Sequence, residues 1–153
     1  MSAEVDDDLF ATVLHAHPEV LRSLDALREA SWAAVDPVVL ELCRLRVAQL
    51  LGCDHELRSR TPRAVAAGLD EAKIAELASW PSSPRFTEWE RTCMALCEQF
   101  LVDVSGIDDE LALAVGDRLG PQGLRDLVTA LLVVEQRQRL RLAWERLFER
   151  GAA

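Results

Sequence analysis

The sequence has few of the residues that interrupt helices, with only 7 Gly and 6 Pro in 153 residues. Ala, Leu, Arg and Glu dominate instead, and these are residues with high helix propensity. A chain of this length fits one domain and can bury roughly two-thirds of the surface that its unfolded form exposes. We therefore predict an all-α fold in a single domain over residues 1–153.

Long apolar runs and positive charge are also scarce. No segment offers the roughly 18 uninterrupted apolar residues of a membrane span, and the acidic start MSAEVDDDLF lacks the basic and apolar regions of a signal peptide. The formal net charge of -9 opposes binding to phosphate backbones. These features predict a cytoplasmic protein that binds neither a membrane nor nucleic acid.

The four cysteines are Cys43, Cys53, Cys93 and Cys97. In a reducing compartment they are expected to be free thiols, either packed in the core or reactive, rather than structural disulfides. Cys93 and Cys97 are four residues apart, but no histidine pair lies near them, so no metal site is predicted. No cofactor is predicted either.

Local signals predict several helices. Asp36-Pro37 is an N-terminal signal for a helix over 37–51, with a buried stripe of Val39, Cys43, Val47 and Leu50 and a stop at Gly52. Pro18 opens an earlier helix, and Thr87 with Glu90 forms a capping box for a later one. Further helices are expected over 54–67, over the segment LDEAKIAELASW, over IDDELALAVGDRLG, and from about Pro121 onward.

The stretch RVAQLLGC followed by AVAAGLDEAKIAEL resembles the carboxymuconolactone decarboxylase family, which includes the alkyl hydroperoxidase D branch. The resemblance implies an all-helical, homo-oligomeric, AhpD-like fold with a family core at about 37–145. In the hydroperoxidase branch, a Glu is followed twelve residues later by C-x-x-C and then by a His four residues past the second Cys. Glu41 and Cys53 have the separation of that Glu and the first Cys. A His is often found between the two cysteine positions of the branch, and His55 occupies that place here.

Two positions depart from the hydroperoxidase pattern. Glu56 stands where the second cysteine would resolve a disulfide, and Arg60 stands where a distal histidine would accept a proton. The ordinary two-cysteine peroxidase mechanism is therefore not expected. The local run HELR, His55 to Arg58, resembles the decarboxylase branch of the family. That branch does not depend on a cysteine pair.

A turn at Gly52 would bring the chain after Asp54 back toward Glu41. We predict that Arg60 then bridges Glu56 and Glu41, either as a solvated ion pair or as part of a substrate pocket. Cys53 is interpreted either as a small buried residue or as a single reactive thiol, because a helix N-terminus and His55 would both favour its thiolate form.

Three functions remain open. The first is a small-molecule enzyme acting by acid–base chemistry on a carboxylate- or lactone-like metabolite, with Arg60 binding the anion, His55 or Glu56 transferring a proton, and Glu41 and Cys53 completing the catalytic set. The second is an antioxidant with peroxiredoxin-like activity that uses Cys53 alone. The third is a non-catalytic binding or assembly member of the family.

Overall fold

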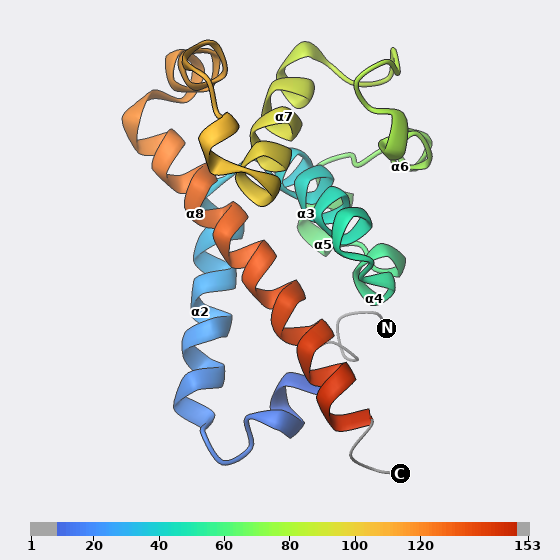
Figure 1. Cartoon of the computed structure of the whole chain (residues 1–153), viewed down its shortest axis with the longest axis vertical. Helices are drawn as coiled ribbons and strands as arrows, with labels where there is room; N and C mark the ends of the chain where they lie inside the picture. The colour runs from blue at the N-terminus through green and yellow to red at the C-terminus, as the bar shows by residue number, and fades with distance from the viewer. Residues whose placement is uncertain (1–8, 150–153) are drawn as a thin grey trace.

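The computed structural model describes residues 9–149, and within that range it contains helices and no β-strand (Figure 1). The all-α prediction is therefore confirmed. None of the helices in this part of the chain is long and apolar enough to cross a membrane. The elements are α2 (Pro18–Ala34), α3 (Pro37–Leu51), α4 (Asp54–Arg58), α5 (Pro62–Ala66), α6 (Glu71–Ala75), α7 (Glu88–Val102) and α8 (Asp109–Glu149), with short 3-10 turns at Leu77–Ser79 and Val104–Gly106.

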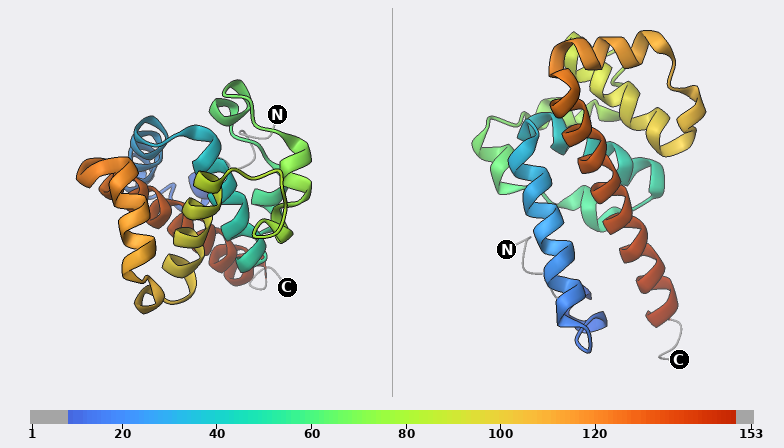
Figure 2. Two further views of the ribbon diagram at one scale, coloured as in Figure 1. Left: turned by 90° about the horizontal axis from the view of Figure 1, so that it is seen from above. Right: turned by 90° about the vertical axis from the view of Figure 1, so that its left-hand side faces the viewer.

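Helix α3 lies at the centre of the arrangement and packs against both α7 and α8. Helices α2 and α8 run side by side in opposite directions and extend together beyond the α3–α7 part of the molecule, as the two side views show (Figures 1 and 2). The short helices α4 and α5 follow α3 and return the chain along it. This return places the segment after Gly52 against α3.

The ends of α3 and α7 follow the predicted signals. Asp36 Oδ1 accepts a hydrogen bond from the Val39 N–H at 2.9 Å, and Pro37 occupies the first turn, where a missing N–H costs nothing. Gly52 ends α3 with a φ of 71°, a left-handed conformation that glycine adopts without a steric penalty. At α7, Thr87 and Glu90 form the predicted reciprocal capping box.

Of two further helix predictions, one is wrong and one agrees with the structure. The continuous helix predicted over 54–67 is wrong, because α4 ends at Arg58 and α5 begins only at Pro62. The proline disfavours helical backbone at the residue before it, and both Ser59 and Thr61 are extended. The two helices predicted on either side of Gly120 are present within α8, where Gly120 has a φ of 68° and kinks the helix.

Helix α3 is buried on nearly every side. Leu40, Cys43 and Val47 pack in the main core with residues of α7 and α8, whereas Leu42 and Leu45 pack in a second core with Leu77, Trp80, Phe86 and Met94. The prediction of a single buried stripe is therefore too narrow. Leu50, which was assigned to that stripe, is 41% exposed.

Candidate functional site

Two charged side chains lie inside the protein on one face of α3. Glu41 is fully buried and Arg44 is only 7% exposed. Arg44 Nε donates to Glu41 Oε2 at 2.9 Å, and Arg44 Nη2 donates to Glu41 Oε1 at 2.7 Å. The pair is three residues apart on the helix and bidentate, a strong geometry for a guanidinium and a carboxylate.

Glu41 also holds the returning chain. The Thr61 N–H donates to Glu41 Oε1 at 3.0 Å, and the Thr61 hydroxyl donates to Oε2 at 2.7 Å. Burial by itself raises the pKa of Glu41, but the hydrogen bonds and charge of Arg44 and the two bonds from Thr61 outweigh it, so the pKa lies below its ordinary value. Glu41 is therefore a charged anchor inside the fold.

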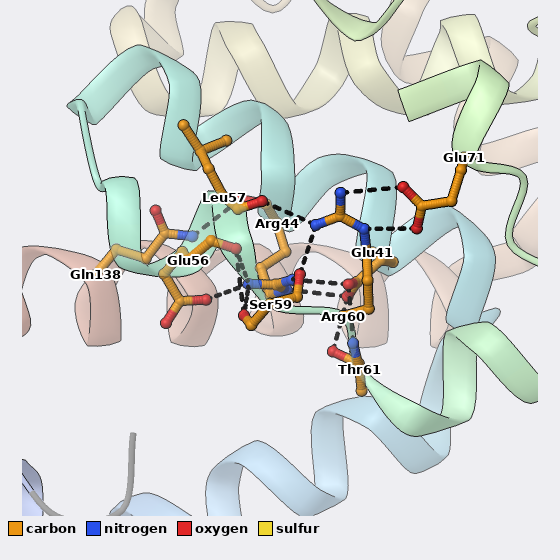
Figure 3. Close-up of polar contacts among 9 residues, drawn as sticks. All are labelled: Glu41, Arg44, Glu56, Leu57, Ser59, Arg60, Thr61, Glu71 and Gln138. Carbon is orange, nitrogen blue, oxygen red and sulfur yellow. Dashed lines mark hydrogen bonds and ion pairs between the residues drawn. The ribbon is translucent and has the colours of Figure 1, made fainter. Parts of the chain in front are cut away.

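Arg44 joins Glu41 to α4 and to the segment that follows it (Figure 3). Its Nη1 pairs with Glu56 Oε2 and donates to the Glu56 carbonyl at 3.1 Å, and its Nη2 donates to the Ser59 carbonyl at 3.0 Å. Burial lowers the pKa of Arg44, but Glu41 and Glu56 together raise it above its ordinary value. All five N–H groups of the guanidinium have acceptors, so Arg44 positions other groups and has no donor left for a ligand.

The predicted bridge by Arg60 is wrong. The chain does return to Glu41 as predicted, but Arg44 makes the bridge between Glu41 and Glu56. Arg60 instead pairs with Glu71 through Nε and Nη2, and its Nη1 donates to the Leu57 and Ser59 carbonyls (Figure 3). The signal for Arg44 was present in the sequence, because Arg44 lies three residues after Glu41.

A cavity of about 330 Å³ lies beside this network. Residues from α2, α8 and the 59–63 segment line it, together with Arg44 and Glu56. Glu56 is 9% exposed, and its Oε1 accepts no hydrogen bond from the described residues, while Arg44 holds Oε2. The network thus presents one carboxylate oxygen of Glu56 at the cavity.

The two sequence-predicted residues before Glu56 lie elsewhere. Cys53 is the residue before α4 and is fully buried, and neither Cys53 nor His55 is among the described residues that line the cavity. Burial raises the pKa of the Cys53 thiol, and the nearby charge of Glu56 adds to this effect. A backbone hydrogen bond from Glu56, in the first turn of α4, lowers this pKa as expected of a helix N-terminus, but burial outweighs it, so the thiolate is not favoured at Cys53.

The other three cysteines belong to the core between α3 and α7. Cys43, Cys93 and Cys97 are fully buried and free. A hydrogen bond with Cys97 and burial raise the pKa of Cys43 well above its ordinary value, and burial raises the pKa of Cys93 to about 12. Within residues 9–149, no cluster of three or more His, Cys, Asp or Glu side chains has the geometry to hold a metal ion.

Residues 18–99 match the model of the carboxymuconolactone decarboxylase family. The chain belongs to this family. A relative from Escherichia coli strain K12, the uncharacterized protein YnjA, is 28% identical over 104 residues. The alignment covers 68% of this chain and 57% of YnjA, so the chain spans little more than half the length of that relative.

A solved structure shows the same fold. The protein comes from Agrobacterium tumefaciens, is of unknown function and has been provisionally named as the antioxidant defence protein AhpD. Its structure superimposes with a TM-score of 0.74 at 19% sequence identity, over 87% of this chain and 92% of the other. The family's AhpD-like helical fold predicted from the sequence is therefore confirmed.

Proposed function

We propose that the protein is a small-molecule enzyme that binds a carboxylate- or lactone-like metabolite in the cavity and transfers a proton at Glu56. The observation that carries this proposal is the state of the Glu56 carboxylate. Arg44 holds Oε2, and Oε1 has no partner among the described residues at the cavity wall. A general base needs this combination of fixed orientation and an available oxygen.

The chemistry is proton abstraction beside a carbonyl. Glu56 Oε1 takes the proton from a substrate carbon next to a lactone or carboxylate carbonyl, and the electron pair of the C–H bond moves into that carbonyl as an enolate. The carboxylic acid so formed exchanges its proton with the solvent and returns a proton to the enolate, so each cycle can replace a substrate hydrogen with one from the solvent. Arg60 lines the cavity and has one of its five N–H groups left for the substrate anion.

The buried network supports Glu56 in this role. Glu41 anchors both Arg44 and Thr61, so the two segments that meet at the cavity are tied to one carboxylate on α3. Because a base displaced by 1 Å loses much of its effect, groups that hold it in place contribute to catalysis without touching the substrate.

The other two hypotheses have less support. A lone-thiol antioxidant needs an accessible thiolate at Cys53, but that thiol is buried, its pKa is raised and the residue does not line the cavity. A non-catalytic member would need no open cavity at Glu56 and Arg60. Homo-oligomeric assembly, the absence of a cofactor and a cytoplasmic location stay predictions from the sequence.

The test measures exchange of substrate C–H hydrogen with deuterium from the solvent. Carboxymuconolactone and simpler carboxylated lactones are incubated with the protein in D₂O, and NMR follows deuterium incorporation. We expect exchange by the wild-type protein and a loss of roughly 100-fold or more in Glu56→Gln, the usual effect of removing a general base.

Glu90→Gln is the matched control for this test. Glu90 is also a buried carboxylate in an ion pair, with Lys73, but it lies outside the cavity lining. Its substitution should leave the exchange rate unchanged. Exchange that survives in Glu56→Gln, or that depends on Cys53 instead, would overturn the proposal.

A further inference from the structure

An exposed ion pair lies at the rim of the cavity between α5 and α2. Arg63 Nη2 donates to Glu29 Oε2 at 2.8 Å, and both residues line the cavity. Their side chains are 47% and 61% exposed. Exposed pairs of this kind contribute about 1 kcal/mol or less, so an anionic ligand can displace Glu29 at little cost.

The arginines on this side of the cavity differ in the N–H groups that they can offer. Arg44 has committed all five of its N–H groups, and Arg60 has committed four. Arg63 makes one hydrogen bond, to Glu29, among the described residues. A guanidinium can bind a carboxylate through two parallel N–H groups, and of these three side chains only Arg63 has two to give.

Part of the wall formed by α2 and α8 is apolar, next to polar and charged residues of the same two helices. Trp32, Val133 and Val134 line the cavity, and each is less than a tenth exposed. A volume of about 330 Å³ is near the lower limit of about 300 Å³ for small-molecule sites, so the apolar part of a ligand must be short.

We propose that the cavity takes a small amphipathic carboxylate, with its apolar body against Trp32, Val133 and Val134 and its carboxylate on Arg63 in place of Glu29. The inference rests on the proposed function, because it assigns a substrate class to the same cavity. It also moves the main anion contact from Arg60 to Arg63, at the rim.

The test is equilibrium binding of short carboxylates, measured by calorimetry without any turnover. Butanoate, pentanoate and hexanoate are compared with hexan-1-ol on the full chain. Each added methylene should tighten binding about fourfold until the cavity is filled, from about 0.8 kcal/mol per buried CH₂. Hexan-1-ol should bind at least about tenfold more weakly than hexanoate, because it lacks the charge that Arg63 binds.

Three substitutions test the carboxylate contact. Arg63→Gln should weaken hexanoate binding about tenfold or more, as expected for loss of a charged hydrogen-bond partner. Glu29→Gln should tighten it by up to about fivefold, because the competing carboxylate is gone. Arg85→Gln is the matched control: Arg85 forms a similarly exposed pair with Glu76, away from the cavity, and should change nothing.

A gain of affinity in Glu29→Gln cannot come from misfolding, so this variant protects the test against a damaged fold. Unchanged binding in Arg63→Gln, weaker binding in Glu29→Gln, or hexan-1-ol binding as tightly as hexanoate would overturn the inference. If carboxylates bind through Arg63 but lactone exchange does not need Glu56, only the proposed function fails. If exchange needs Glu56 but binding ignores Arg63, only this inference fails.

Discussion

Helix α3 carries two buried surfaces with opposite chemistry. Toward α7 it presents Cys43, which contacts Cys93 and Cys97 in an apolar core. On another side it carries the buried pair Glu41 and Arg44, of which Arg44 lines the cavity. A hydrogen bond with Cys97 and burial raise the pKa of the Cys43 thiol, and burial would raise that of Glu41 as well, yet the pKa of Glu41 is lowered.

The difference lies in the hydrogen-bond partners. Glu41 receives four hydrogen bonds, from Arg44 and Thr61, that stabilise its charged form against desolvation. The core thiols receive no cation as a hydrogen-bond partner among the described residues. Burial therefore leaves the cysteines as small apolar packing groups, whereas a matched set of donors keeps a carboxylate charged in the interior.

The largest expected effect concerns the thiols. In the native protein, iodoacetamide should modify Cys43, Cys93 and Cys97 about 1,000-fold or more slowly than in urea, because a stability of at least about 5 kcal/mol opposes exposure of the core. Cys53, which is also buried, should be protected too. Mass spectrometry of quenched samples gives the rates for each site. Rapid native labelling of Cys53 would instead revive the lone-thiol antioxidant.

Removing the buried cation should cost the most stability. Arg44→Met leaves Glu41 buried without its ion-pair partner, and the free energy of unfolding should fall by about 3–5 kcal/mol in urea titrations. Arg85→Met, at an exposed pair, should cost far less stability than Arg44→Met. If the two variants were equally stable, the buried ion pairs of Arg44 would not stabilise the fold.

A smaller effect is expected on the way the free energy of unfolding falls at acidic pH. The pKa of Glu41 in the folded state lies below 4.5, so its stabilisation is complete above pH 4.5 and is lost as the pH falls through the folded value. Glu41→Gln should therefore flatten the fall of unfolding free energy below that pH. Urea titrations at several acidic pH values measure the slope. An unchanged slope would show that Glu41 does not carry this linkage.

Local signals predicted most of the helix boundaries because their causes are local. Each signal acts within a few residues: the acceptor and proline at Asp36-Pro37, the glycine at 52 and the capping box at Thr87. The prediction is wrong at 54–67, because Pro62 keeps the residue before it out of the helical region and separates α4 from α5. The stripe that included Leu50 failed because α3 packs on several sides, which one-dimensional periodicity does not reveal.

The candidate site was only partly predictable for a different reason. The family pattern pointed to Glu41 and Glu56, and the turn at Gly52 correctly predicted that the chain returns to Glu41. The choice between Arg44 and Arg60 as the bridge depends on which side chain points inward after the return. That orientation follows from the break at Ser59–Thr61 and from the competing acceptor Glu71.

The sequence by itself determined the helical fold, the family and the loss of the second cysteine, because composition, caps and motif spacing are local properties of the chain. Only the tertiary structure decided that Cys53 is buried, that Arg44 is saturated and that Arg63 keeps N–H groups for a ligand. These properties depend on which groups remain accessible and unpaired after α2, α8 and the 59–63 segment come together. Burial and hydrogen-bond partners are set by residues far apart in the sequence, so no local pattern encodes them.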